Sequence, residues 1–171
     1  MSALAPALRK LWHAALHLQR GVLVFCAVLL TLMIFTQVVA RYLFQTAIFG
    51  IEEVAVYIAV WFYFLGGAMG ASERGHISAS LADVLVKNET TQQAIKTLSS
   101  LITSVVCAWM VVWSWGLTSW SLKLGMMSTE VNIPIGYVHL AMPVGLGLMT
   151  LYFVAELIEH GIELARRLRT P

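Results

Sequence analysis

The sequence predicts an all-α membrane protein with four transmembrane helices, an N-terminal amphipathic helix at the membrane interface, and both termini in the cytoplasm. Only 12% of its 171 residues are charged, against about 25% in an average soluble domain. The mean hydropathy of +0.79 is too high for a water-facing surface. Four stretches without Asp, Glu, Lys or Arg approach or exceed the roughly 20 residues that cross a bilayer core. We expect one integral membrane domain over residues 1–171.

The first predicted element is an amphipathic helix over residues 7–20. At about 100° per residue, its leucines, alanines and Trp12 share one arc, while its cations and histidines share the other. Such a helix lies flat at the inner interface, with Trp12 at headgroup depth and Arg9 and Lys10 facing anionic lipid. Gln19 alone does not fit the pattern. The alternative is that these residues form the cytoplasmic start of the first spanning helix.

The spanning helices follow from the uncharged stretches, with short connections between them. We predict them at residues 21–43, 52–73, 95–122 and 131–157, the last with a cytoplasmic extension to about residue 168. Residues 77–88 are predicted to form a cytoplasmic amphipathic connection. In the last span, Pro134 falls in the first turn, where an amide is unpaired in any case, and Pro143 predicts a bend.

The orientation follows from the distribution of lysine and arginine. Nine of the 11 fall on one side of the predicted membrane: Arg9, Lys10, Arg20, Arg74, Lys87, Lys96, Arg166, Arg167 and Arg169. Arg41 and Lys123 are on the other side. The positive-inside rule therefore places both termini and the loop between the second and third spans in the cytoplasm. A net charge of +2 is too small to suggest a nucleic-acid partner, so membrane lipids are the expected surroundings.

The residues of the spans predict no catalytic, substrate, cofactor or metal site. The uncharged stretches lack the ionisable groups that bind ions or relay protons in transporters. His13 and His17 are four residues apart, but a metal site needs three or four ligands. His139 is the one histidine well inside a span, which excludes a bis-histidine haem site. A haem-binding membrane anchor would therefore have to ligate the iron with His139 and a methionine from another helix.

Two groups of residues predict helix packing. Gly66 and Gly70 form a GxxxG pair, and Gly67 begins a second small pair one residue later, so another helix can approach closely. Trp109 and Trp113 lie along one face of the third span, away from the interface that tryptophan prefers. The glycines serve either a partner subunit or internal packing within a four-helix bundle, and the tryptophans face either protein or lipid.

Three segments together resemble the DctQ-type small permease, which is the small membrane subunit of tripartite ATP-independent periplasmic (TRAP) transporters. The first is Arg41-Tyr42-Leu43-Phe44, followed by Glu52 and Glu53; the second runs from Trp61 and Phe64-Leu65-Gly66-Gly67 to Arg74-Gly75-His76-Ile77; the third comprises Ile133-Pro134-Ile135-Gly136-Tyr137 and Met142-Pro143-Val144-Gly145. The segments occur in the family's order and spacing, and the resemblance extends over nearly the whole chain. The sequence departs from the family at Ser78, Ala79 and Ser80, where members often carry an acidic residue.

The resemblance implies a scaffold subunit of a sodium-coupled organic-acid importer in the bacterial inner membrane. A large membrane subunit would carry the substrate and sodium sites, and a soluble periplasmic protein would bind the substrate and deliver it. Which substrate is imported cannot be read from this chain. The rival class is a self-assembling small exporter, and it requires a buried carboxylate that the spans lack.

Under this interpretation, Arg41, Glu52 and Glu53 are predicted to form a polar patch at the outer face that docks the binding protein. The alternatives are that Arg41 extends to the lipid headgroups and that the two carboxylates cap the positive end of the second helix. His76 is predicted to order the inner turn after Gly75.

Overall fold

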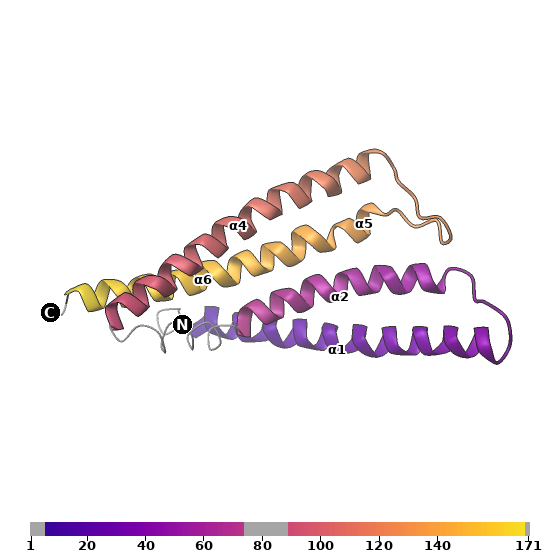
Figure 1. The fold of residues 1–171 in the computed structure, drawn as a ribbon, viewed down its shortest axis with the longest axis horizontal. Helices are drawn as coiled ribbons and strands as arrows, with labels where there is room; N and C mark the ends of the chain where they lie inside the picture. The colour runs from indigo at the N-terminus through magenta and orange to yellow at the C-terminus, as the bar shows by residue number, and fades with distance from the viewer. Residues whose placement is uncertain (1–5, 74–88, 170–171) are drawn as a thin grey trace.

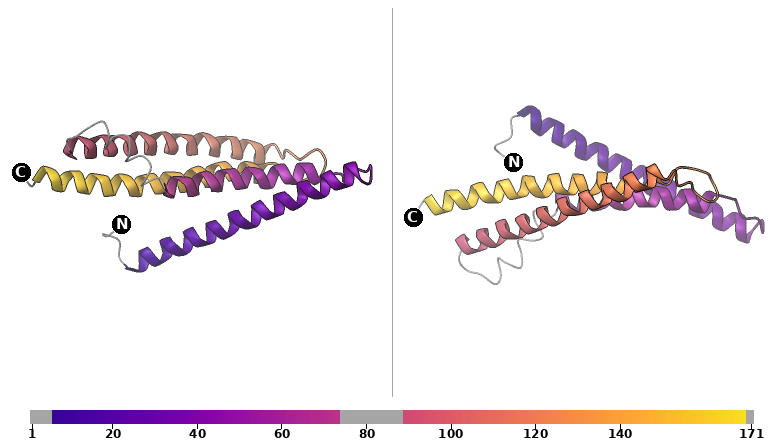
Figure 2. Two further views of the ribbon diagram at one scale, coloured as in Figure 1. Left: turned by 60° about the horizontal axis from the view of Figure 1, so that its bottom comes forward. Right: turned by 90° about the horizontal axis from the view of Figure 1, so that it is seen from above.

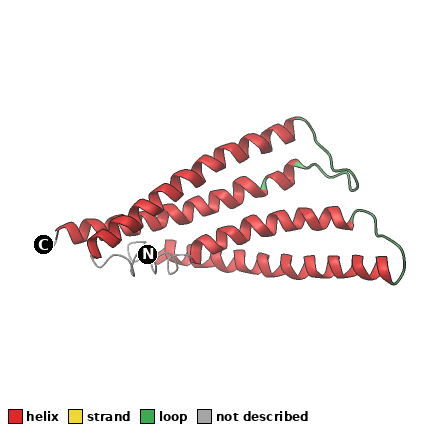
Figure 3. Cartoon of the chain, in the orientation of Figure 1, coloured by secondary structure: helices red, strands yellow, loops and turns green. Residues whose placement is uncertain are grey.

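The computed structural model describes residues 6–73 and 89–169, and these residues form helices joined by short connections (Figures 1 and 3). The helices are α1 (Pro6–Tyr42), α2 (Ile51–Glu73), α4 (Glu89–Lys123), the single turn α5 (Gly136–His139) and α6 (Ala141–Arg169). Four segments of them are long and apolar enough to span a membrane, as predicted. The predicted connection 77–88 and His76 lie outside the described residues.

Helix α1 contains both the predicted amphipathic helix and the predicted first span. It runs unbroken for 37 residues, which is about 55 Å at 1.5 Å per residue. Residues 7–20 therefore do not form a separate helix; they extend the spanning helix at its N-terminal end. This agrees with the alternative that these residues form the start of the first spanning helix. Arg41 lies in the last turn of α1, where its positive charge interacts favourably with the negative end of the helix dipole.

The four long helices lie side by side in the order α1, α2, α6, α4, forming an open layer (Figure 2). Helix α2 packs between α1 and α6, and α6 packs between α2 and α4. Among the described residues, α1 and α4 share no extensive contact. Consequently, both sides of the layer leave large apolar side chains exposed, most of all on α1 and α4.

The core lies toward the end of the layer that holds both termini. Ala68 and Ala71 of α2, Cys107 of α4, and Tyr152 and Phe153 of α6 form one buried cluster. The small alanines bring α2 close to α6, because without a hydrophobic force between helices in lipid, tight packing stabilises the contact. Helix α6 is the most buried of the four spans, as expected for a helix with neighbours on both sides.

The last span begins later than predicted and breaks one turn after it starts. Residues 131–135 are not helical, and the helix begins at Gly136 in place of residue 131. A break at Leu140 separates α5 from α6, three residues before the predicted bend at Pro143. Because Pro143 has no N–H, it cannot donate to the His139 carbonyl. The Thr118 hydroxyl of α4 donates to that carbonyl instead, at 3.1 Å, so the break is tied to the neighbouring helix.

Candidate functional site

Two connections lie at the end of the layer opposite the termini (Figure 1), and a hydrogen bond joins them. The first joins α1 to α2, and the second joins α4 to α5. The backbone N–H of Gly50 donates to Glu130 Oε2 at 3.0 Å. Gly50 has a φ of +80°, and a Cβ there would lie 3.3 Å from Val131 Cγ2. Glycine therefore suits both the turn and the close approach of the two connections.

Glu53 is the centre of this junction. Its carboxylate accepts the backbone N–H groups of Thr129 at 3.0 Å, Glu130 at 2.9 Å and Val131 at 3.0 Å. The hydroxyl of Tyr57, one turn later in α2, donates to the same carboxylate at 2.6 Å. Sequence reasoning assigned Glu53 to a docking patch or to a helix cap. The structure shows a further role that those alternatives did not include, namely holding the second connection against α2.

The second connection is itself ordered by its own hydrogen bonds. The N–H of Ser128 donates to the Ile133 carbonyl at 2.9 Å, and the N–H of Ile135 donates to the Met126 carbonyl at 2.9 Å. The Ile133 N–H donates to Ser128 Oγ at 3.1 Å. Asn132 adopts a φ of 59°, a conformation that asparagine tolerates better than most residues. We call residues 126–135 the outer hairpin, a name that means only that they lie at the end of the layer opposite the termini.

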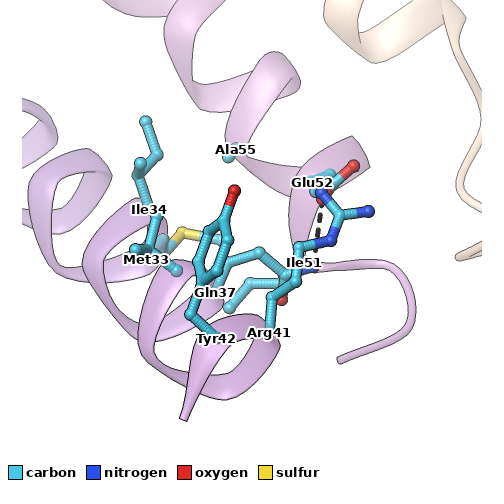
Figure 4. Close-up of a pocket in the computed structure, with 9 residues that line it drawn as sticks. Met33, Ile34, Gln37, Arg41, Tyr42, Ile51, Glu52 and Ala55 are labelled. Atoms are coloured by element: carbon cyan, nitrogen blue, oxygen red, sulfur yellow. Dashed lines mark hydrogen bonds and ion pairs between the residues drawn. The ribbon is translucent and has the colours of Figure 1, made fainter. Parts of the chain in front are cut away.

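Arg41 and Glu52 form an exposed ion pair on the other side of the start of α2 (Figure 4). Arg41 Nη1 lies 3.6 Å from Glu52 Oε1, and the two side chains are 60% and 61% exposed. Gln37 Nε2 donates to Glu52 Oε1 at 3.0 Å, and its Oε1 accepts the Ile48 N–H at 3.3 Å. The structure thus brings Arg41 and Glu52 together, and it adds Gln37, which sequence reasoning missed. The sequence feature that could have indicated this role is the amide of Gln37 within the uncharged stretch 21–40.

The residues predicted to anchor the N-terminus at the interface include one that packs inward. The Trp12 ring makes an edge contact with the Tyr152 ring, with centroids 5.1 Å apart. Lys10 is exposed. Gln19, the misfit of the amphipathic pattern, is buried: its Nε2 donates to the Leu65 carbonyl at 2.8 Å, and its Oε1 accepts the Tyr152 hydroxyl at 2.7 Å. One amide therefore joins α1, α2 and α6.

The predicted packing glycines face different neighbours. A Cβ at Gly66 would lie 3.8 Å from Leu23 of α1, and one at Gly67 would lie 3.9 Å from Met149 of α6. A Cβ at Gly70 would meet nothing within 4 Å. Gly66 and Gly67 are thus in ordinary contact within the layer, whereas Gly70 leaves open space.

Trp109 and Trp113 of α4 border an apolar groove on the surface of the layer. They are 67% and 68% exposed. The groove has a volume of about 510 Å³ and also contacts Phe64 of α2 and Met142 and Leu146 of α6. Three helices therefore contribute to one surface at this place. Among the described residues, no group of three or more His, Cys, Asp and Glu side chains is arranged to hold a metal ion.

Comparison with known proteins decides the family. A sequence model of the family "Tripartite ATP-independent periplasmic transporters, DctQ component" matches residues 30–161. The chain belongs to the DctQ family. A protein of Haemophilus influenzae named "Putative TRAP transporter small permease protein" is 26% identical over 132 residues, which cover 76% of this chain and 79% of that relative. This DctQ chain is accordingly a multi-pass membrane protein and a component of a TRAP transporter.

Proposed function

We propose that this DctQ subunit is the scaffold of a sodium-coupled organic-acid importer in the bacterial inner membrane. It would brace a large membrane subunit that carries the substrate and sodium sites, and it would help to dock a periplasmic binding protein. Sodium coupling and the substrate class follow from the family resemblance. The single observation that best supports the scaffold role is the open layer, whose uncharged spans leave wide apolar faces and present no ion-binding groups.

The proposed orientation has both termini in the cytoplasm. The two ends of the described chain lie at the same end of the layer (Figure 1). The positive-inside distribution favours the cytoplasm for that end. The outer hairpin and the ion pair of Arg41 with Glu52 would then face the periplasm, where a soluble binding protein arrives.

The apolar groove bordered by Trp109 and Trp113 is the proposed contact for the large subunit. Trp113 and Trp109 lie 10 and 14 residues before Lys123, the cation at the outer end of α4. At 1.5 Å per residue they are about 15 and 21 Å below that end, near the middle of a core of about 30 Å. Tryptophan prefers the membrane interface. Its exposure at this depth, beside a groove made by three helices, supports contact with protein, and Gly70 supplies further space for a close helix.

The proposed docking surface for the binding protein combines the exposed pair with the outer hairpin. Arg41 and Glu52 are available for direct contact. Glu53 would act indirectly, because its carboxylate already holds the hairpin backbone. Charge reversal at both exposed residues, Arg41→Glu with Glu52→Lys, is expected to reduce uptake in cells that retain normal levels of the subunit. Lys123→Glu is the matched control at the same end of the layer.

Copurification tests the scaffold role. A tagged full-length chain is expressed together with the large membrane subunit of a TRAP transporter from the same organism, and the amount of that partner recovered is measured. The double variant Trp109→Ala with Trp113→Ala is expected to lose the partner, while Trp115→Ala, which removes an exposed tryptophan outside the groove, is expected to keep it. Equal recovery of the partner with the wild-type chain, the double variant and Trp115→Ala would reject the groove as the contact. Solute transport by this chain alone in liposomes would reject the scaffold role itself.

A further inference from the structure

A second cavity lies between α1 and the start of α2 (Figure 4). The proposed docking surface includes two residues at its rim, Arg41 and Glu52, but not the apolar cavity below them. Its volume is about 230 Å³. Met33, Ile34, Val38 and Ala55 supply apolar wall, while Arg41 and Glu52 stand at the charged rim. Pockets for whole small molecules measure about 300–1,000 Å³. This cavity is therefore suited to part of a larger molecule whose remainder lies outside it.

The depth of the cavity matches one leaflet of a bilayer. Arg41 directly follows the uncharged run 21–40, which is about as long as the hydrocarbon core is thick. The guanidinium is therefore at headgroup level. Met33 lies eight residues earlier, or about 12 Å deeper along the helix. The cavity thus leads from the headgroups into the acyl-chain region.

The charges at the rim have one positive and one negative member, both accessible. The Arg41–Glu52 separation of 3.6 Å is longer than a hydrogen bond. An arginine carries five N–H donors in a fork that matches a phosphate. The Glu52 carboxylate is fixed by Gln37 at 3.0 Å and is 61% exposed, so it can accept N–H groups from an ammonium.

We propose that this cavity binds a phosphatidylethanolamine molecule of the outer leaflet. Its phosphate would contact Arg41, its primary ammonium would contact Glu52, and one acyl chain would lie along the apolar wall. A quaternary choline has no N–H to donate to Glu52. The glycerol of phosphatidylglycerol is neutral and offers no cation to pair with that carboxylate, so this lipid keeps a net negative charge beside Glu52. The assignment to the outer leaflet rests on the proposed orientation, whereas binding of the lipid needs neither the substrate nor a partner subunit.

Lipid retention tests the site. The full-length chain is placed in nanodiscs containing equal amounts of phosphatidylethanolamine, phosphatidylglycerol and phosphatidylcholine, then released and examined by native mass spectrometry. The wild-type chain is expected to retain phosphatidylethanolamine preferentially. Arg41→Ala is expected to reduce this retention about tenfold, since charge-assisted hydrogen bonds are among the strongest. Lys123→Ala is the matched control, because it removes the other outer cation, and it is expected to retain the lipid.

Two further variants separate the parts of the site. Val38→Phe fills the apolar wall at a partly exposed position and keeps both charges, so it is expected to lose the lipid. Because the outer patch is intact in this variant, lipid loss with normal uptake would also separate this site from docking. Glu52→Gln is expected to lower the preference for phosphatidylethanolamine over phosphatidylglycerol. Wild-type retention by both Arg41→Ala and Val38→Phe, equal loss in Lys123→Ala, or a wild-type preference for another headgroup would overturn the proposal.

Discussion

Among the glycines of α6, Gly145 is the one that lies against α2, and its replacement by alanine tests how the layer is held together. A Cβ at this position would lie 2.7 Å from the Cβ of Phe64, 2.8 Å from its carbonyl oxygen and 2.9 Å from its carbonyl carbon. Carbon atoms pack best at about 3.5–4.0 Å. Two of the three atoms are backbone in the middle of α2, so a change of side-chain rotamer cannot relieve the contact. The two helices would have to separate by about 1 Å.

The expected magnitude follows from two opposing effects. Overpacking of this kind costs about 1–3 kcal/mol, while replacing glycine by alanine within a helix contributes about 0.5–1 kcal/mol. Gly147 lies two residues after Gly145, and a Cβ there would meet nothing within 4 Å. Gly147→Ala therefore carries the gain in helix propensity without the overpacking. The two variants are expected to differ by about 1–3 kcal/mol in the free energy of unfolding.

Reversible unfolding in detergent micelles, followed by circular dichroism, measures this difference. Gly145→Ala is expected to unfold at a lower denaturant concentration than wild type, and Gly147→Ala at an equal or slightly higher one. Equal midpoints for the two alanine variants would refute the reasoning, because they would show that α2 and α6 can move apart without loss of stability.

Two other substitutions test the hydrogen bonds at the two ends of the layer. Tyr152→Phe removes the hydroxyl that donates to Gln19. The buried amide oxygen then lacks its donor, so the free energy of unfolding in the same micelle assay is expected to fall by about 1–3 kcal/mol. An unchanged midpoint would contradict the role of Gln19. Glu53→Gln replaces one oxygen of the carboxylate that accepts three backbone N–H groups by an NH2 group, which cannot accept. Amide hydrogen exchange at Thr129, Glu130 and Val131 is therefore expected to accelerate. Glu52→Gln, the control, should leave that exchange unchanged.

The number and type of the elements could be predicted because they depend on local composition. Each uncharged stretch has to form a helix in lipid, since its backbone groups have no water to bond. The ends of the helices were less predictable. Residues 131–135 are apolar enough to continue a span, but the bonds of Ser128 with Ile133 fix them in the outer hairpin. Those bonds join residues of a loop, and helical periodicity gives no sign of them.

The arrangement of the helices and the roles of single polar residues were not predictable from the pattern. Gln19 looked like an error in an amphipathic face because its partners, Leu65 and Tyr152, are far away in the sequence. Glu53 matched a helix cap equally well, and only the position of the outer hairpin reveals its main acceptor role. The pair of Arg41 and Glu52 was predictable, because both flank one short connection.

The same polar residues explain how an open layer can keep a fixed shape in lipid. Apolar contacts between helices are little better than contacts with lipid tails, so they do not by themselves select one arrangement. Gln19 joins three helices near the end of the layer that holds the termini. Thr118 ties α4 to the break before α6, and Glu53 joins α2 to the outer hairpin. Each tie satisfies a backbone carbonyl or N–H group from another element, and such groups are costly to leave unpaired away from water. Shape is therefore fixed at both ends of the layer, while the apolar faces between them stay available for a partner.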